Sequence, residues 1–129
     1  MPMTMNKPVS DAPLLSARQP RIELSHAALR HNLSRVRTLA PNSKVVCMVK
    51  ADAYGHGLEF ALQGLQDTDV FGVACIQEAR QIRQLSYAQP IALIEGVFNA
   101  AEWLEASQQH FECVIHQQQQ VKWALANPE

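Results

Sequence analysis

Lys50 is the residue in this sequence whose surroundings best suit covalent chemistry. It follows Val45–Val49, an apolar run that is rich in valine and reads as a strand buried on both faces. Burial disfavours the charged form of a lysine, so an amine at such a strand end can have a lowered pKa and act as a Schiff-base nucleophile. The alternative is a lysine whose alkyl stem lies along the strand while its ammonium group reaches water.

The residues that follow Lys50 favour a ligand site. Gly55 and Gly57 can adopt backbone angles closed to other residues and allow a ligand to approach the main chain. Tyr54 places a phenol hydroxyl just beyond the strand end. A strand, a glycine turn and a helix also present free amide groups at the helix N-terminus, which suit a phosphate. An amine, a phenol and a phosphate cradle together fit a phosphorylated aldehyde cofactor.

The segment Val49–Gly57 resembles the lysine motif of the alanine racemases, which are pyridoxal-phosphate enzymes. That motif usually reads Val-Lys-Ala-Asn-Ala-Tyr-Gly-His-Gly, and eight of its nine positions match, with Asp52 in place of the asparagine. The similarity runs from about Arg21 to the last residue and covers roughly the first third of such an enzyme. It includes Arg30–Leu33, Phe71–Ala74 with Glu78–Ala79, and Leu93–Gly96.

The resemblance implies a racemase that interconverts L-alanine and D-alanine and supplies D-alanine for peptidoglycan. Lys50 would hold pyridoxal 5'-phosphate as an aldimine and act as the catalytic base on the face that serves D-alanine. Tyr54 would bind the cofactor phosphate. In this family the opposing tyrosine and the arginines for the pyridine nitrogen and the substrate carboxylate lie beyond the residues matched here. We therefore expect a homodimeric full-length enzyme, and an N-terminal fragment of 129 residues that is inactive or nearly so.

Three other interpretations stay open. The lysine motif handles the cofactor and says little about the bound side chain, so a broad-spectrum amino-acid racemase is one alternative. A non-catalytic pyridoxal-phosphate binding protein on a similar barrel is the second, although the run Tyr54–Gly57 argues against it. A remnant without function is the third.

Several polar residues near the lysine have less specific roles. A carboxylate against Lys50 would favour the ammonium form, so we expect Asp52 to point away from the pocket or to be solvated. His56 is interpreted as a functional or structural residue of the turn rather than as an acid-base catalyst. Glu78 and Arg80 are predicted to form surface ion pairs.

The rest of the chain predicts the architecture that positions Lys50. Strands are expected to start at Val45, Val70, Ile91 and Phe111, and each is followed by an amphipathic helix. Short apolar strands that alternate with helices indicate a parallel sheet, either doubly wound or closed into a barrel. The resemblance implies the barrel. We therefore predict an α/β fold, the incomplete N-terminal half of a (β/α)8 TIM-type barrel with four strand-helix units, and Lys50 at a strand's C-terminal end.

Local signals predict further boundaries. Arg21–Leu24 reads as a short strand, and Ser25 as the N-cap of a helix that Pro41 terminates. Asn99 and Glu102 have the spacing of a capping box. Gly72, inside a predicted strand, indicates close backbone approach.

Composition narrows the function classes. Eleven basic and twelve acidic residues give a net charge of -1, with no basic cluster, so nucleic acid is an unlikely partner. No apolar run approaches the length needed to cross a membrane, and no His and Cys grouping has metal-ligand spacing. The three cysteines are expected to be reduced core residues. We expect a cytoplasmic protein with a disordered tail over 1–20 and a partial barrel domain over 21–129.

Overall fold

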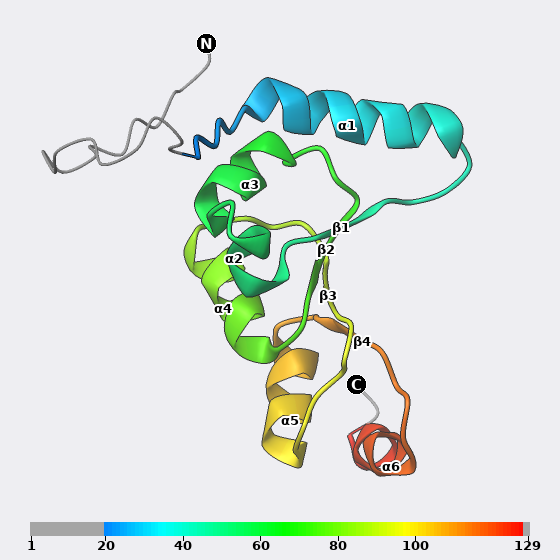
Figure 1. The fold of residues 1–129 in the computed structure, drawn as a ribbon. Helices are drawn as coiled ribbons and strands as arrows, with labels where there is room; N and C mark the ends of the chain where they lie inside the picture. Colours follow the sequence, from blue (N-terminus) through cyan, green and yellow to red (C-terminus); the bar gives the residue numbers. More distant parts are fainter. Residues whose placement is uncertain (1–19, 128–129) are drawn as a thin grey trace, which may run out of the picture.

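The computed structural model of this chain describes residues 20–127 and contains a four-stranded parallel sheet in the order β1-β2-β3-β4 (Figure 1). Helices alternate with the strands, which confirms the predicted strand-helix units and the partial-barrel architecture. The strands are β1 (Val46–Met48), β2 (Val70–Val73), β3 (Ile91–Leu93) and β4 (Glu112–Cys113). The helices are α1 (His26–Leu39), α2 (Lys50–Tyr54), α3 (Leu58–Gly64), α4 (Ile76–Gln84), α5 (Ala100–Gln108) and α6 (Gln118–Ala126).

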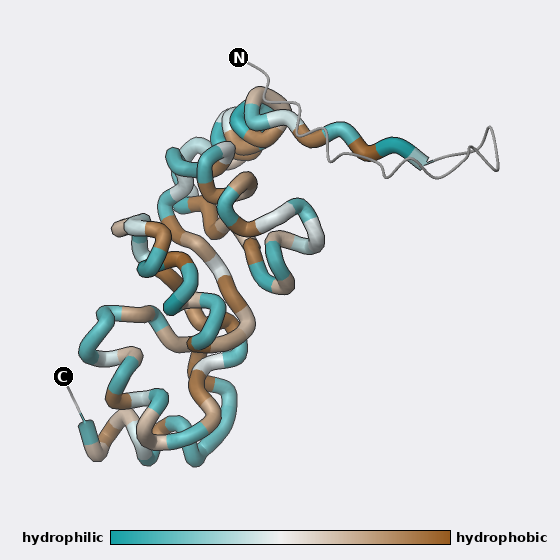
Figure 2. Tube along the Cα trace, turned by 90° about the vertical axis from the view of Figure 1, so that its left-hand side faces the viewer, coloured by the Kyte–Doolittle hydropathy of each residue, from teal (hydrophilic) through white to brown (hydrophobic). Residues whose placement is uncertain are grey.

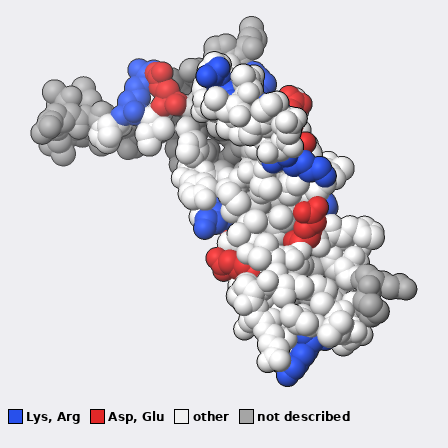
Figure 3. Space-filling view, turned by 90° about the vertical axis from the view of Figure 1, so that its right-hand side faces the viewer, with Lys and Arg blue, Asp and Glu red and all other residues white. Residues whose placement is uncertain are grey.

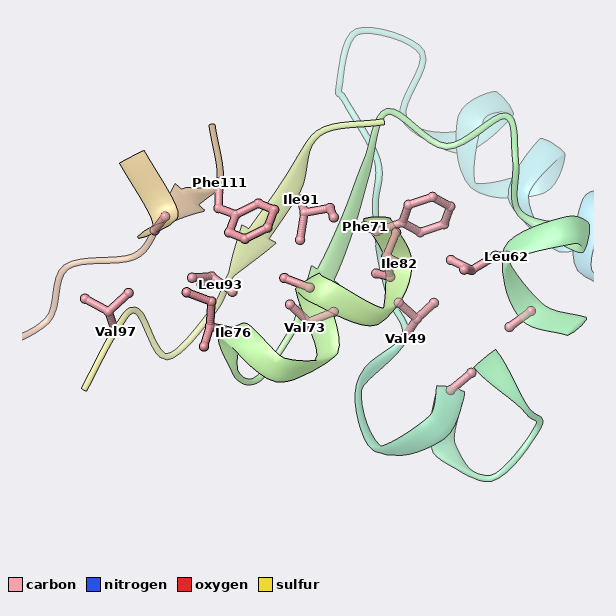
Figure 4. Close-up of a cluster of buried hydrophobic side chains, with 14 residues drawn as sticks. Val49, Leu62, Phe71, Val73, Ile76, Ile82, Ile91, Leu93, Val97 and Phe111 are labelled. Carbon is pink, nitrogen blue, oxygen red and sulfur yellow. The ribbon is translucent and has the colours of Figure 1, made fainter. Parts of the chain in front are cut away.

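The core lies between the sheet and the helices α3, α4 and α5, which run along one side of the strands (Figure 1). Helix α4 buries Ile76, Ala79 and Ile82, a three-residue spacing that places them on one face. Figure 4 shows Ile76 and Ile82 beside the side chains of the strands. The fully buried strand residues include Phe71, Val73, Ile91 and Leu93. The tube in Figure 2 shows the same distribution, with apolar segments concentrated along the strands.

Alternation along β1 gives its two faces different surroundings. Cys47 packs against the helix-covered core, as the period of two predicts. Val46 and Met48 lie on the opposite face, beside Gly72 of the neighbouring strand. A β-carbon on Gly72 would lie 2.3 Å from the sulfur of Met48 and 3.0 Å from Cγ1 of Val46, so side chains of the neighbouring strand approach this glycine closely.

The Asp69 carboxylate and the Thr68 hydroxyl connect the start of β1 to the start of β2. Asp69 accepts hydrogen bonds from the Val45 amide at 2.7 Å and from the Arg37 guanidinium of α1 at 3.1 Å. The pKa of Asp69 lies below its usual value, chiefly because of the Val45 amide and then because of Arg37. Thr68 adds a hydrogen bond from its hydroxyl to the Val45 carbonyl, 3.1 Å long. The N-terminal ends of β1 and β2 are therefore held together by Arg37 of α1 and by Thr68 and Asp69 of the loop before β2.

Gln120 of α6 ties together the ends of β3 and β4. Its side chain is 0% exposed. Its Nε2 donates to the carbonyls of Glu95 and Val97, each at 3.2 Å, and its Oε1 accepts from the His116 amide at 2.9 Å. Gln117 is the N-cap of α6, and Gln120 lies buried in the first turn of this otherwise polar helix start.

The N-terminal segment differs from the prediction. Arg21–Leu24 is not a strand, because the sheet of the described residues consists of β1 to β4 and offers this segment no ladder partner. Ile22 is 84% exposed. Ser25 is the N-cap of α1, as predicted, and accepts a hydrogen bond from the Ala28 amide. The tail predicted over 1–20 lies, except for residue 20, outside the described residues.

The surface opposite α3–α5 carries scattered acidic and basic side chains, with no continuous patch of either sign (Figure 3). Between residues 20 and 127 no helix combines the length and the apolar character that crossing a bilayer would require. All three cysteines are free and partly buried, and burial raises the pKa of the Cys113 thiol.

Candidate active site

Lys50 is the second residue after the end of β1, at the C-terminal edge of the sheet. The residue before it, Val49, is 1% exposed and lies among core side chains such as Leu62 and Phe71 (Figure 4). The Val49 amide donates to the Gly72 carbonyl at 2.9 Å. Lys50 itself is half-buried. The main chain that enters the lysine is therefore fixed by the sheet and the core, as expected for a catalytic group at a barrel strand end.

The chain after Lys50 forms a left-handed turn. Ala51, Asp52, Ala53 and Tyr54 have φ between 52° and 55°. Left-handed backbone costs a residue other than glycine about 1–2 kcal/mol, so four in succession store several kcal/mol. Such strain persists only where the surrounding structure over-determines it, and it concentrates at functional sites.

Main-chain and side-chain contacts hold this turn in place. The Ala53 amide donates to the Val49 carbonyl at 3.0 Å, and the Gly57 amide donates to the Asp52 carbonyl at 3.0 Å. Ala53 is buried in the core. Nδ1 of His56 lies 2.9 Å from the Ala53 carbonyl, within hydrogen-bonding distance. His56 thus has the structural role in the turn that the sequence interpretation allowed.

Asp52 connects the turn to the next helix. Its Oδ1 accepts a hydrogen bond of 2.8 Å from the amide of Leu58, which is the first residue of α3. Aspartate satisfies free amides at helix starts well. The ion pairs of residues 20–127 do not include one between Asp52 and Lys50. The Asp52 carboxylate is therefore occupied at the helix start, in agreement with the expectation that it does not serve the lysine.

Glu78 is the contact that the sequence interpretation missed. Its carboxylate accepts from the Ala51 amide through Oε1 and from the Ala74 amide through Oε2, each at 2.7 Å. The prediction of a surface ion pair is wrong for Glu78, because two main-chain donors at the sheet edge already occupy its oxygens. The prediction is right for Arg80, whose Nε donates to Glu105 at 2.6 Å. A glutamate at the third position of a helix can accept a hydrogen bond from a main-chain amide before the helix. This position was the sequence signal for the bond between Glu78 and Ala74.

Tyr54 is the last residue of the left-handed turn, so the turn places it close in sequence and in space to the strand end. Tyr54 is 58% exposed, and its hydroxyl makes no hydrogen bond within residues 20–127. A phenol in this state is free to bind a ligand group. Gly55 follows with φ 86°, which a residue with a side chain rarely adopts.

The residues present fit pyridoxal 5'-phosphate. They supply an amine on a fixed strand end and a phenol on a rigid turn. Gly72 and Ala92 align with Met48 in the register of the sheet, and the Met48 side chain lies over Gly72. The hollow on the outer side of the turn, lined by Asp52, His56 and residues of α3 and α4, does not include Lys50 or Tyr54. The fit therefore rests on the chemistry and the placement of Lys50 and Tyr54.

Comparison with known proteins agrees with this geometry. The model of the alanine racemase N-terminal domain matches residues 24–129. The alanine racemase of Psychrobacter sp. (strain PRwf-1) is 47% identical over 109 residues, which are 84% of this chain and 29% of that protein. The biosynthetic alanine racemase of Escherichia coli (strain K12) is 45% identical over 100 residues, 78% of this chain and 28% of the relative.

A solved structure gives the same result in three dimensions. The alanine racemase of Acinetobacter baumannii superposes with a TM-score of 0.79 at 53% identity, over 81% of this chain and 29% of that one. The chain thus spans less than a third of the length of the relatives it matches. Its strand-helix units, its lysine turn and the match over most of its length place it, by descent, in the alanine racemase family, within the N-terminal domain.

Proposed function

We propose that this chain supplies the cofactor-binding half of an alanine racemase barrel, with Lys50 as the residue that binds pyridoxal 5'-phosphate covalently. The observation that carries the proposal is the placement of Lys50 between a buried strand end and a strained left-handed turn. The left-handed turn costs conformational free energy. The turn and the buried strand end together fix the main chain on both sides of the Lys50 amine. The family match over residues 24–129 supports the same assignment.

Each site residue has a distinct task in the proposal. The Lys50 amine binds the aldehyde and, when substrate is present, holds or releases a proton on one face of alanine. The Tyr54 hydroxyl donates a hydrogen bond to the cofactor phosphate. The bound cofactor withdraws electrons and makes the α-hydrogen of alanine acidic. The product D-alanine would serve peptidoglycan synthesis.

Racemization requires a proton donor on the second face of alanine. In this proposal that donor belongs to a full-length homodimeric enzyme, and residues 1–129 alone bind the cofactor without turning over alanine. The relatives named above are alanine racemases, and this supports alanine as the substrate. A broader substrate range would appear as turnover of other amino acids by the full-length enzyme.

The experiment is a titration of the purified chain with pyridoxal phosphate, followed through the absorbance of the cofactor. Lys50→Arg keeps the charge and removes the nucleophile, so saturable binding should fall to the level of a surface lysine. Lys44→Arg is the matched control, because Lys44 is exposed at the opposite end of the same strand. Equal binding by Lys50→Arg and the unmodified chain would overturn the assignment of Lys50. Turnover of alanine by the 129 residues would overturn the proposed need for a proton donor from outside them.

A further inference from the structure

Two hydrogen bonds bracket Lys50. On one side, the Val49 amide is held by the Gly72 carbonyl of β2. On the other side, the Ala51 amide is held by the Glu78 carboxylate of α4 at 2.7 Å. The Ala51 amide belongs to the peptide plane that starts at the Lys50 carbonyl. Fixing this plane fixes the ψ angle of Lys50, and with it the direction in which the Cα–Cβ bond of the lysine leaves the main chain.

The Ala51 amide needs this partner. The ladder of β1 ends with the Val49 amide, and the left-handed turn begins at Ala51, so neither element accepts a bond from it. A main-chain donor without a partner at the sheet edge would rely on water and would leave the first strained residue of the turn unsupported. The carboxylate meets this need with a charge-assisted bond, which is shorter and stronger than a neutral one.

The second oxygen of Glu78 makes the support rigid. It accepts from the Ala74 amide at 2.7 Å, directly after β2. One carboxylate therefore joins the residues that follow β1 and β2, and it does so from the first turn of α4, where a negative charge is favoured by the helix dipole. Both oxygens are occupied, so the side chain has little freedom to leave either strand end.

From these contacts we propose that Glu78 is a positioning residue for Lys50. By holding the Ala51 peptide against β2, its carboxylate keeps the lysine amine directed at the site of the cofactor aldehyde. This inference rests on the proposed function for its role in cofactor binding, whereas the fixing of the lysine turn itself is independent of any ligand.

Glu102 provides a matched control. It is also the third residue of its helix, α5, and it accepts from the amide four residues before it, Phe98, at 2.9 Å. Glu78 has the same relation to Ala74. The two glutamates thus share the local helix-start contact, and only Glu78 adds a bond to the lysine turn. Subtracting the effect of Glu102→Ala from that of Glu78→Ala isolates the added bond.

The first test is amide hydrogen exchange, measured residue by residue on the cofactor-free chain. Glu78→Ala should speed exchange at Ala51 and along 51–57 by about tenfold or more, because the lost bond is charge-assisted. Glu102→Ala should leave those amides unchanged. Glu78→Gln keeps one acceptor oxygen and should give an intermediate rate, and it replaces Glu78→Ala if that variant does not fold. Equal rates at Ala51 in the Glu78 and Glu102 variants would overturn the proposal.

The second test is binding of pyridoxal phosphate by the same variants. Glu78→Ala should weaken binding about tenfold, by the same argument, and Glu102→Ala should bind as the unmodified chain does. Unchanged binding by Glu78→Ala would refute the positioning role while the proposed function of Lys50 stands. If the unmodified chain itself takes up no cofactor at Lys50, the proposed function fails, and the exchange rates at Ala51 still decide whether Glu78 fixes the turn.

Discussion

The C-terminal ends of the pair β1–β2 and of the pair β3–β4 are each held together by one side chain, but the two side chains differ in chemistry. In each pair this side chain comes from the third residue of the helix that follows, Glu78 of α4 and Gln120 of α6. Each accepts from the amide four residues before it, at Ala74 and His116. Their other contacts differ. Glu78 accepts from a second amide, whereas Gln120 donates to two carbonyls and is completely buried.

The main chain explains this difference. After β1 the left-handed turn exposes an amide, and a carboxylate can only accept. After β3 the loop presents carbonyls around Gly96, and only a donor such as the Gln120 amide group can satisfy them. The comparison shows that the β1–β2 end combines strain, a carboxylate and a lysine, while the β3–β4 end is closed by a neutral, buried network. Cofactor chemistry is thus expected at the first end only.

Exchanging the side-chain types of Glu78 and Gln120 should give the largest difference in stability between the two ends. Gln120→Glu would place a carboxylate against the Glu95 and Val97 carbonyls in a buried site, and we expect it to destabilise the fold by about 3 kcal/mol or more. Glu78→Gln, in a half-buried site, should cost less than about 1.5 kcal/mol. Urea unfolding followed by tryptophan fluorescence measures both. A Gln120→Glu variant as stable as Glu78→Gln would contradict the distinction drawn between the two ends.

Two glycines with positive φ, one at each end, allow the tightness of packing at the two ends to be compared. Gly96 has φ 71°, and a β-carbon there would lie 2.4 Å from the Val114 carbonyl and 2.6 Å from Nε2 of Gln120. Gly55 has φ 86° and no atom within 4 Å of such a carbon. Gly55→Ala should therefore cost only the backbone strain, about 1–2 kcal/mol, and Gly96→Ala about 1–3 kcal/mol more because of overlap.

The same unfolding measurement checks this order. Equal losses in the two alanine variants would mean that the β3–β4 loop can yield, and that its network is less tightly packed than the contacts of Gly96 and Gln120 indicate.

The smallest expected effect concerns the opposite end of β1. The pKa of Asp69 is lowered by the Val45 amide and by Arg37. Its folded pKa is below the unfolded value of about 3.9, so it stabilises the fold above that pH, and this contribution is lost as the pH falls through the folded pKa. Between about pH 5 and pH 2 the unmodified chain should lose more stability than Asp69→Asn.

Asp67→Asn is the control for this pH dependence, since Asp67 contacts Arg37 through its main-chain carbonyl. Its curve should follow that of the unmodified chain. Asp69→Asn should also leave amide exchange at Ala51 unchanged, because β1 is held at its two ends by different carboxylates. A coupled response at Ala51 would show that the two ends act as one unit.

The repeating features of the fold could be predicted from the sequence. Alternation along β1 placed Cys47 in the core and Met48 on the other face, and the three-residue spacing of Ile76, Ala79 and Ile82 gave the buried face of α4. These patterns are local, and burial enforces them over several residues. Ser25 and Asn99 were found as helix caps for the same reason.

The features that were missed depend on contacts distant in sequence. Glu78 contacts Ala51 across 27 residues, and its position in the first turn of a helix indicates only the local bond to Ala74. The left-handed turn contains alanines, which do not favour positive φ, so it exists because the surrounding contacts impose it. Arg21–Leu24 has strand alternation but lacks a ladder partner among residues 20–127. The position of Lys50 after the strand and of Tyr54 in the turn that follows could be predicted from the sequence, whereas the contacts that hold this turn could not.

The most direct test of the central claim is to incubate the chain with pyridoxal phosphate, reduce it with borohydride, and locate the added mass by peptide mapping. The account predicts modification confined to Lys50, with Lys7, Lys44 and Lys122 unmodified. Modification spread over all four lysines would contradict it, because the strand end and the left-handed turn would then confer no selectivity on the Lys50 amine.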